Sequence, residues 1–283
     1  MHRRARDRRH LPRDSGRLSH RERIVNDLAG RTIVVTGAAA GLGRAISVRL
    51  AASGAHIVAV DLRSSEATVD LIVAGGGSAL AVRADVTATD DAERIIGDAQ
   101  AITGRLDAVV NNAGRYGGSA ILDTTDEEWD DYLDVNLRST FVMTRASVRR
   151  MIEQDERDGV RGRVVNMASQ LGITGPPAAL GYGVAKAGVI QLTRQVAVDY
   201  GRHGIVVNAI APGRIITGDH PGEREYLESG AIDAATEFSL ARTPFSRLGA
   251  PEDIAGAAAF LVSDDCRFVS GAVLAVDGGW TAY

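Results

Sequence analysis

The chain has 283 residues, of which 45% are hydrophobic and 24% charged, as is typical of a globular protein with one large core. The single cysteine, Cys266, excludes a disulfide framework and a multi-cysteine zinc site. Because no apolar run reaches membrane-spanning length, we expect a protein that binds no membrane and is located in the reducing cytoplasm.

Charge is unevenly distributed along the chain. Residues 1–23 hold nine arginines and three acidic residues, an excess of six positive charges in a chain whose net charge is −4. The remainder therefore carries −10, and a body of that charge repels nucleic acid. We predict that residues 1–27 form a disordered Arg-rich extension, and that the folded domain spans residues 28–283 without a nucleic-acid partner.

From Arg31 onward, seven short apolar runs alternate with longer helical patterns. The runs are Thr32–Thr36, His56–Val60, Ala79–Val82, Leu106–Val110, Arg163–Met167, Ile205–Ile210 and Ala272–Val276. They lack polar alternation, as is typical of parallel strands that helices cover on both faces. Apolar residues at three- and four-residue spacing predict helices at 42–53, 88–102, 126–151, 181–202 and 251–262. We therefore predict a single α/β domain, a doubly wound Rossmann-type parallel sheet of order 3-2-1-4-5-6 with a seventh edge strand.

A glycine-rich turn follows the first strand and leads directly into a helix. Gly37, Gly41 and Gly43, with Leu42 between the last two, permit a tight turn and close approach of the backbone to a ligand. The free N–H groups of the helix N-terminus attract phosphates. The position predicts a pyrophosphate site of a dinucleotide cofactor, against the alternative of a tight turn that binds nothing.

Polar residues also end the next three strands. Asp61 lies where a carboxylate accepts hydrogen bonds from ribose hydroxyls and repels a 2′-phosphate, which favours NAD over NADP, although Arg63 could hold that phosphate. Asp85 and Val86 follow the third strand and would meet the adenine. Asn111, Asn112, Ala113 and Gly114 follow the fourth. Each of these could instead be a turn or capping residue.

Tyr182 and Lys186 lie four residues apart in a helical pattern, so both side chains share one helix face. Of the 32 basic residues 31 are arginine, and Lys186 is the only lysine, which indicates a position that requires a compact ammonium. A nearby ammonium favours the phenolate and lowers the pKa of the tyrosine. The phenol would then exchange a proton with an alcohol, and Ser169, after the fifth strand, would hydrogen-bond the substrate oxygen.

Over Leu28–Tyr283 the chain resembles the short-chain dehydrogenase/reductases. The motifs that carry the resemblance are the Thr36–Gly43 turn, Asn111–Gly114, Pro212–Gly213, and the set Asn136, Ser169, Tyr182 and Lys186. The resemblance implies that Tyr182 is the acid/base, that Lys186 binds the nicotinamide ribose, and that Asn136 holds a water linking Lys186 to solvent. It also implies that Ile215 and Thr217 contact the nicotinamide carboxamide. Finally, it implies a homotetramer packed through residues 126–151 and 181–202.

Residues 213–249 should form the loop and helices over the substrate. Residues 241–249 and 276–280 resemble those of sugar and polyol dehydrogenases. We therefore predict an oxidoreductase that moves a hydride between NAD and an alcohol or carbonyl of a sugar or polyol. The alternatives are a 3-oxoacyl carrier-protein reductase, in which Arg138, Arg145, Arg149 and Arg150 would meet an acidic carrier, and a non-catalytic nucleotide-binding regulator. No metal is expected, because His220 has no second ligand at a metal-site spacing.

Overall fold

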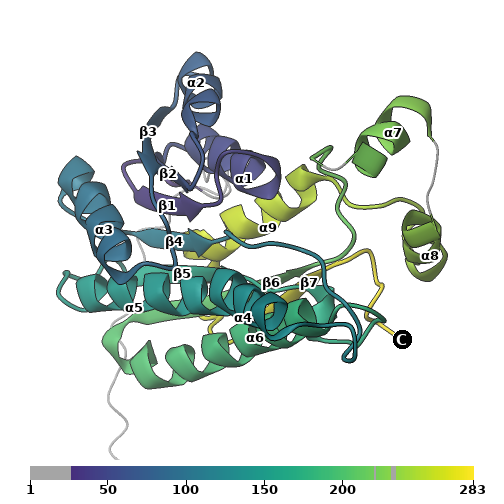
Figure 1. The fold of residues 1–283 in the computed structure, drawn as a ribbon. Helices are drawn as coiled ribbons and strands as arrows, with labels where there is room; N and C mark the ends of the chain where they lie inside the picture. The colour runs from purple at the N-terminus through teal and green to yellow at the C-terminus, as the bar shows by residue number, and fades with distance from the viewer. Residues whose placement is uncertain (1–26, 220, 231–233) are drawn as a thin grey trace, which may run out of the picture.

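The structure, a computed structural model, describes residues 27–219, 221–230 and 234–283. The expected Arg-rich extension lies outside the described residues except for Asp27, and His220 lies outside them too. Seven parallel strands form one sheet in the order β3-β2-β1-β4-β5-β6-β7, with helices on both faces (Figure 1). The predicted fold class and strand order are confirmed.

The strands lie close to the predicted runs. They are β1 Thr32–Thr36, β2 His56–Asp61, β3 Ser78–Arg83, β4 Ala108–Asn111, β5 Gly162–Met167, β6 Ile205–Pro212 and β7 Val273–Val276. The largest difference at a strand start is β4, which begins two residues after the predicted Leu106. There the Gln154 side chain replaces a neighbouring strand, because it accepts from Leu106 N at 2.7 Å and donates to Leu106 O at 2.9 Å.

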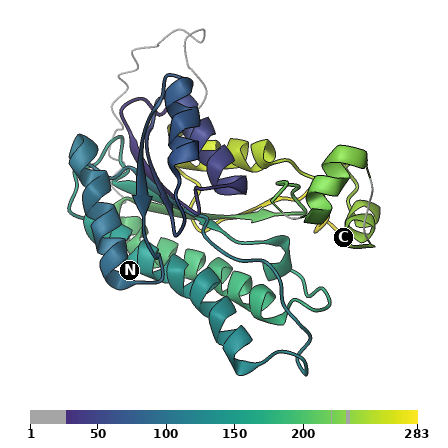
Figure 2. The same ribbon diagram turned by 45° about the horizontal axis from the view of Figure 1, so that its top comes forward.

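Two layers of helices cover the sheet, as Figure 2 shows from a second direction. On one face lie α1 Gly41–Ala52, α2 Glu66–Ala74 and α9 Pro251–Val262; on the other lie α3 Thr89–Thr103, α4 Asp126–Leu133, α5 Ser139–Met151 and α6 Leu180–Tyr200. Successive side chains of a strand point to opposite faces. Accordingly Ile33 and Val35 pack in the core beneath α1 and α9, and Val34 packs in the core on the other face.

The prediction of one helix over residues 126–151 is wrong in detail. A π-helical turn at Asp134–Arg138 separates α4 from α5. Asn136 lies in this turn, fully buried, and its side-chain amide donates to Tyr132 O and to Arg115 O, both at 3.1 Å. The inserted turn therefore points a polar side chain at the strand edge, as π-turns at functional sites often do.

Helix α2 was not indicated by the apolar spacing. Only Thr68 and Ile72 of this helix are buried, whereas Leu71 and Val73 are exposed, so its sequence has no clear apolar stripe. The helix is held partly by a side chain, since Thr68 Oγ1 donates to Ala38 O at 2.8 Å. A helix this short, with so few buried residues, has no apolar periodicity by which its sequence would predict it.

Two short helices, α7 Pro221–Ser229 and α8 Ala234–Arg242, lie beside the C-terminus at one end of the sheet (Figure 1). They belong to the segment 213–249 that was expected to cover the substrate. We call α7, α8 and the loop 217–219 the lid. Within the described part of the chain, no helix has the length and apolar character needed to cross a membrane.

Candidate active site

The carboxyl ends of β1, β2, β4, β5 and β6 meet at one edge of the sheet, beside a cavity of about 1050 Å³. The cavity extends from the glycine turn, past Asp61 and Asp85, to Ser169, Tyr182 and the lid. Ligands of open α/β sheets bind at this edge. Among the described residues, no group of three His, Cys, Asp or Glu side chains could hold a metal ion.

The glycine turn leaves no space for side chains. A Cβ on Gly43 would lie 2.0 Å from Gly37 O, and a Cβ on Gly41 would lie 2.5 Å from the Asp219 carboxylate of the lid. Asn112, just after β4, holds the turn, because its amide donates to Thr36 O at 2.9 Å and to Gly37 O at 3.3 Å. The turn is thus packed tightly against the sheet, and Gly37, Gly41 and Leu42 line the cavity.

Asp61 lies at the end of β2 with its carboxylate against the turn. Its Oδ2 accepts from Ala39 N at 3.0 Å and its Oδ1 from Arg63 N at 2.9 Å. The Arg63 side chain is 72% exposed, with Nε 3.7 Å from the carboxylate. Asp61 is therefore fixed in the cavity wall, whereas the guanidinium beside it lies largely in solvent.

Asp85 and Val86 also line the cavity. The Asp85 side chain is exposed and accepts from Thr87 N at 2.9 Å and from Thr87 Oγ1 at 2.7 Å. These bonds are those of a turn residue, the alternative that the sequence left open.

Asn111 does not belong to the cavity wall, which begins at Asn112. Its amide donates to Asn166 Oδ1 at 2.8 Å and to Thr144 Oγ1 at 3.0 Å, buried between the sheet and α5. Because side chains alternate along a strand, Asn111 and Asn112 point in different directions. The side chain of Asn111 thus has a structural role, and its cofactor contact stays a prediction, whereas Ala113 and Gly114 line the cavity.

Ser169, two residues after β5, and Tyr182, in the first turn of α6, both line the cavity. Ser169 is buried, and its Oγ accepts from Leu171 N at 3.1 Å. The ring of Tyr116 packs edge-on against the ring of Tyr182, with centroids 5.3 Å apart. Burial raises the pKa of Tyr182 to about 12, and a hydrogen bond with Ser169 lowers it less.

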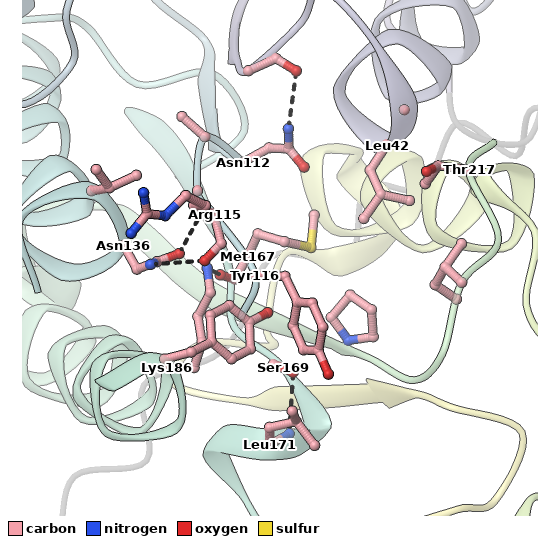
Figure 3. Close-up of a pocket in the computed structure, with 18 of the residues that line it drawn as sticks. Leu42, Asn112, Arg115, Tyr116, Asn136, Met167, Ser169, Leu171, Lys186 and Thr217 are labelled. Atoms are coloured by element: carbon pink, nitrogen blue, oxygen red, sulfur yellow. Dashed lines mark hydrogen bonds between the residues drawn. The ribbon is translucent and has the colours of Figure 1, made fainter. Parts of the chain in front are cut away.

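Lys186 is 3% exposed, and its Nζ donates to Met167 O at 2.8 Å (Figure 3). The ammonium lies 5.6 Å from the centre of the Tyr182 ring. It has no carboxylate within ion-pair distance in the described ranges, and burial lowers the pKa of Lys186 to about 8. A Cβ on Gly114 would lie 3.3 Å from Nζ and 2.6 Å from Asn136 Oδ1, so the lysine tip fills its space closely.

One electrostatic prediction needs correction. The ammonium was expected to lower the pKa of Tyr182, yet the pKa of the phenol is raised. Desolvation of the phenolate is the largest cause of the raised pKa of Tyr182, and burial likewise disfavours the charged ammonium of Lys186. Burial therefore shifts the two pKa values toward each other, lowering that of Lys186 and raising that of Tyr182.

Ile215 and Thr217 line the cavity after β6. Thr217 is held by Glu223 of α7, whose Oε2 accepts from Thr217 N at 3.0 Å, from Thr217 Oγ1 at 2.8 Å and from Gly218 N at 3.1 Å. Glu223 is 5% exposed. No local sequence pattern indicates this role, and only the structure shows that Glu223 ties α7 to the loop.

Sequence reasoning also missed the far end of the cavity. Its walls are Tyr116, Gln170, Leu171, Pro176, Pro177, Arg214, Phe238 and Trp280. These residues come from five separate segments of the chain, so no local spacing relates them. The sequence could have indicated these residues only by their position, since most of them follow the end of a strand or lie in the segment 213–249.

A family model described as enoyl-(acyl carrier protein) reductase matches residues 37–281. The chain is 37% identical over 259 residues to 2-(S)-hydroxypropyl-CoM dehydrogenase 3 of Xanthobacter autotrophicus, covering 91% of this chain and 99% of the relative. It is 34% identical over 255 residues to 2-dehydro-3-deoxy-D-gluconate 5-dehydrogenase of Escherichia coli, covering 90% and 97%. A structure from Agrobacterium tumefaciens with bound NADP is 38% identical, covers 92% of this chain and 100% of its own, and has a TM-score of 0.81.

The chain is a short-chain dehydrogenase/reductase. It is accordingly an oxidoreductase that acts on CH–OH groups with a nicotinamide dinucleotide.

The close packing at Lys186 predicts that shape matters in addition to charge. Lys186→Arg keeps a cation, but a planar guanidinium does not fit between Met167 O and Gly114. We expect turnover to fall at least about a hundredfold, and the affinity for the dinucleotide to weaken, in steady-state and fluorescence titrations. Arg194→Lys, the reverse exchange at an exposed position of α6, is the matched control. Near-normal turnover of Lys186→Arg would show that charge alone suffices.

Proposed function

We propose that this dehydrogenase oxidises a secondary hydroxyl of a sugar or polyol, with NAD as the hydride acceptor and Tyr182 as the proton acceptor. The observation that carries the proposal is the cluster of Ser169, Tyr182 and Lys186 in one cavity beside the glycine turn. The relatives add support, since the Escherichia coli relative is named for a sugar-acid substrate and another, in Bacillus subtilis, is a glucose 1-dehydrogenase.

The residues present fit a nicotinamide dinucleotide. Gly37, Gly41 and Leu42 line one end of the cavity at the N-terminus of α1, Gly43 packs against Gly37 O, and the cavity continues from there to Tyr182. Asp61 would hold the adenosine ribose, with Val86 near the adenine and Ile215 and Thr217 at the carboxamide. When bound, the nicotinamide accepts the hydride, two electrons and one proton, that leaves the carbinol carbon.

The side chains of the site then bind the substrate hydroxyl and accept its proton. Ser169 orients the substrate hydroxyl, and Tyr182 receives its proton as the carbonyl forms. Tyr182 must be ionised to accept this proton, and the ammonium of Lys186, 5.6 Å from the centre of the ring, favours the phenolate. Asn136 is a positioning residue, because its Oδ1 accepts from Arg115 N at 3.1 Å beside the lysine tip and could hold a water that leads to solvent.

We propose NAD as the preferred cofactor, on the fixed carboxylate of Asp61. A carboxylate there repels a 2′-phosphate. Arg63 is the only feature nearby that favours NADP among the described cavity residues, and its side chain lies mostly in solvent. Because a related structure contains NADP, the preference between NAD and NADP has to be measured for this protein.

A 3-oxoacyl carrier-protein reductase requires a basic surface that is free to bind the acidic carrier. The four arginines predicted to form that surface instead interact with neighbouring side chains of this chain. Arg138 pairs with Asp134 at 3.9 Å, Arg149 with Glu93 at 2.6 Å, and Arg150 with Glu153 at 3.0 Å; Arg145 lies over the Phe141 ring. A surface neutralised in this way attracts an acidic carrier weakly. The three residues Ser169, Tyr182 and Lys186 together likewise argue against a non-catalytic regulator.

We also propose a homotetramer in the cytoplasm. Phe141 on α5, Val198 on α6, and Phe268 and Val269 before β7 are exposed apolar residues, which favours association through these elements. Light scattering should give a mass about four times 29.8 kDa.

Tyr182→Phe tests the mechanism. The substitution removes the proton acceptor and keeps the ring, so we expect NAD-dependent alcohol oxidation to fall about a hundredfold or more. NAD affinity, measured by fluorescence titration, should change little. Tyr200→Phe on the same helix is the control. Near-normal turnover of Tyr182→Phe would refute Tyr182 as the acid/base.

Asp61→Ser tests the cofactor preference. We expect the unmodified protein to use NAD at least about tenfold better than NADP in kcat/KM, a ratio that needs only about 1.4 kcal/mol. Removing the carboxylate should narrow this ratio, because the repulsion disappears while Arg63 remains. Equal use of both cofactors by the unmodified protein would mean that Arg63 captures the phosphate.

A further inference from the structure

The far end of the cavity holds buried polar atoms that bond to nothing in the described chain. Gln170 Oε1, Arg214 Nε and Trp280 Nε1 each lie buried without a hydrogen-bond partner. Gln170 is 7% exposed and Trp280 4%, and all three residues line the cavity. A buried polar atom is costly unless it is hydrogen-bonded. The two N–H donors, on Arg214 and Trp280, and the acceptor oxygen of Gln170 could all be satisfied by a bound ligand that carries several hydroxyl or carboxylate oxygens.

Arg214 differs from the other cations that line the cavity. Those others, within the described ranges, are Arg63, Arg115 and Lys186. Arg63 lies beside Asp61, Arg115 forms an ion pair with Asp131, and Lys186 donates to a backbone carbonyl. The Arg214 side chain has neither an ion pair nor a hydrogen bond within the described ranges. Arg214 also lines a second, smaller cavity with Asp253 and Asp277, and it forms an ion pair with neither. A guanidinium without a carboxylate partner matches the two oxygens of a bound carboxylate.

The acidic residues of the lid do not neutralise Arg214. Glu223 is occupied by three donors of the loop, and the Asp219 carboxylate lies against Gly41 at the opposite, pyrophosphate side. Apolar rings complete the wall. Trp280 is held from behind by Arg242, whose guanidinium lies 4.4 Å from its ring centre, and Tyr116 packs on Tyr182. Rings with a polar handle suit the C–H face of a polyol.

We propose that the substrate is a polyol that carries a carboxylate, a sugar acid, and that Arg214 anchors this carboxylate. The inference rests on the proposed function, because the reacting carbinol lies at Ser169 and Tyr182. Gln170 and Trp280 bond hydroxyls between that carbinol and the carboxylate. Oxidation converts the carbinol to a ketone, with the hydride leaving to NAD and the hydroxyl proton to Tyr182, while the carboxylate remains unchanged.

Matched pairs of substrates test the role of the carboxylate. The pairs are D-gluconate with D-sorbitol and D-galactonate with galactitol. In each pair the acid has a carboxylate where the alditol has a terminal CH₂OH group. With NAD and the full chain, we expect at least one acid to have a kcat/KM about tenfold or more above that of its alditol. Arg214→Gln should remove this advantage by raising KM for the acid, with little change in kcat or in oxidation of the alditol.

Further variants test geometry and folding. Arg214→Lys keeps the charge without the two-pronged contact and should restore part of the advantage. Trp280→Phe removes the donor and should weaken acid and alditol equally. Arg194→Gln, at an exposed position of α6, is the matched control and should change nothing. Unchanged NAD affinity of Arg214→Gln would show that the variant is folded.

The inference is overturned if no acid exceeds its alditol, or if Arg214→Gln keeps the full preference for the acid. In either case oxidation of the alditols, or of a simple secondary alcohol such as cyclohexanol, would leave the proposed function intact. If the protein reduces NAD with none of these alcohols, acidic or neutral, the proposed function fails along with the inference.

Discussion

The site is arranged around a buried ammonium that has no counter-ion in the described part of the chain. Lys186 is the only lysine, and it is held by a backbone carbonyl, Met167 O, where a carboxylate would be the common partner. Burial lowers the pKa of this lysine to about 8 while it raises that of Tyr182 to about 12. A carboxylate beside Lys186 would hold the proton on the lysine. Its absence keeps that proton exchangeable near neutral pH.

The parallel sheet supplies the remaining constraint. Strand ends that are far apart in the sequence meet at one edge, so the glycine turn after β1 and Ser169 after β5 face one cavity. Two small details complete the edge. The π-helical turn points Asn136 at the lysine tip, and Gly114 leaves the space that both side chains need. Glu223 of the lid fixes the loop beside the glycine turn, because its carboxylate accepts from the Thr217 and Gly218 backbone.

The sequence predicts those parts that depend on local pattern. Apolar runs locate the seven strands, and the spacing of Tyr182 and Lys186 places both on one helix face. Features set by distant contacts escape this reasoning: α2 has almost no apolar stripe, and the π-helical turn depends on bonds between Asn136 and Arg115. The direction of the Tyr182 pKa shift was also missed, because a sequence shows a nearby charge but not the desolvation of a buried phenol. Arg214 and its neighbours come together only in the folded chain.

The most direct test is a titration of the Lys186 ammonium itself. Because the chain contains a single lysine, labelling with ¹⁵N-lysine gives one Nζ resonance, whose chemical shift can be followed by NMR as the pH is raised. The account predicts a midpoint at about 8 in the folded protein, and loss of this resonance in Lys186→Arg confirms its assignment. A midpoint near the ordinary value of 10.5 would show that the ammonium is solvated or paired, and would contradict the account.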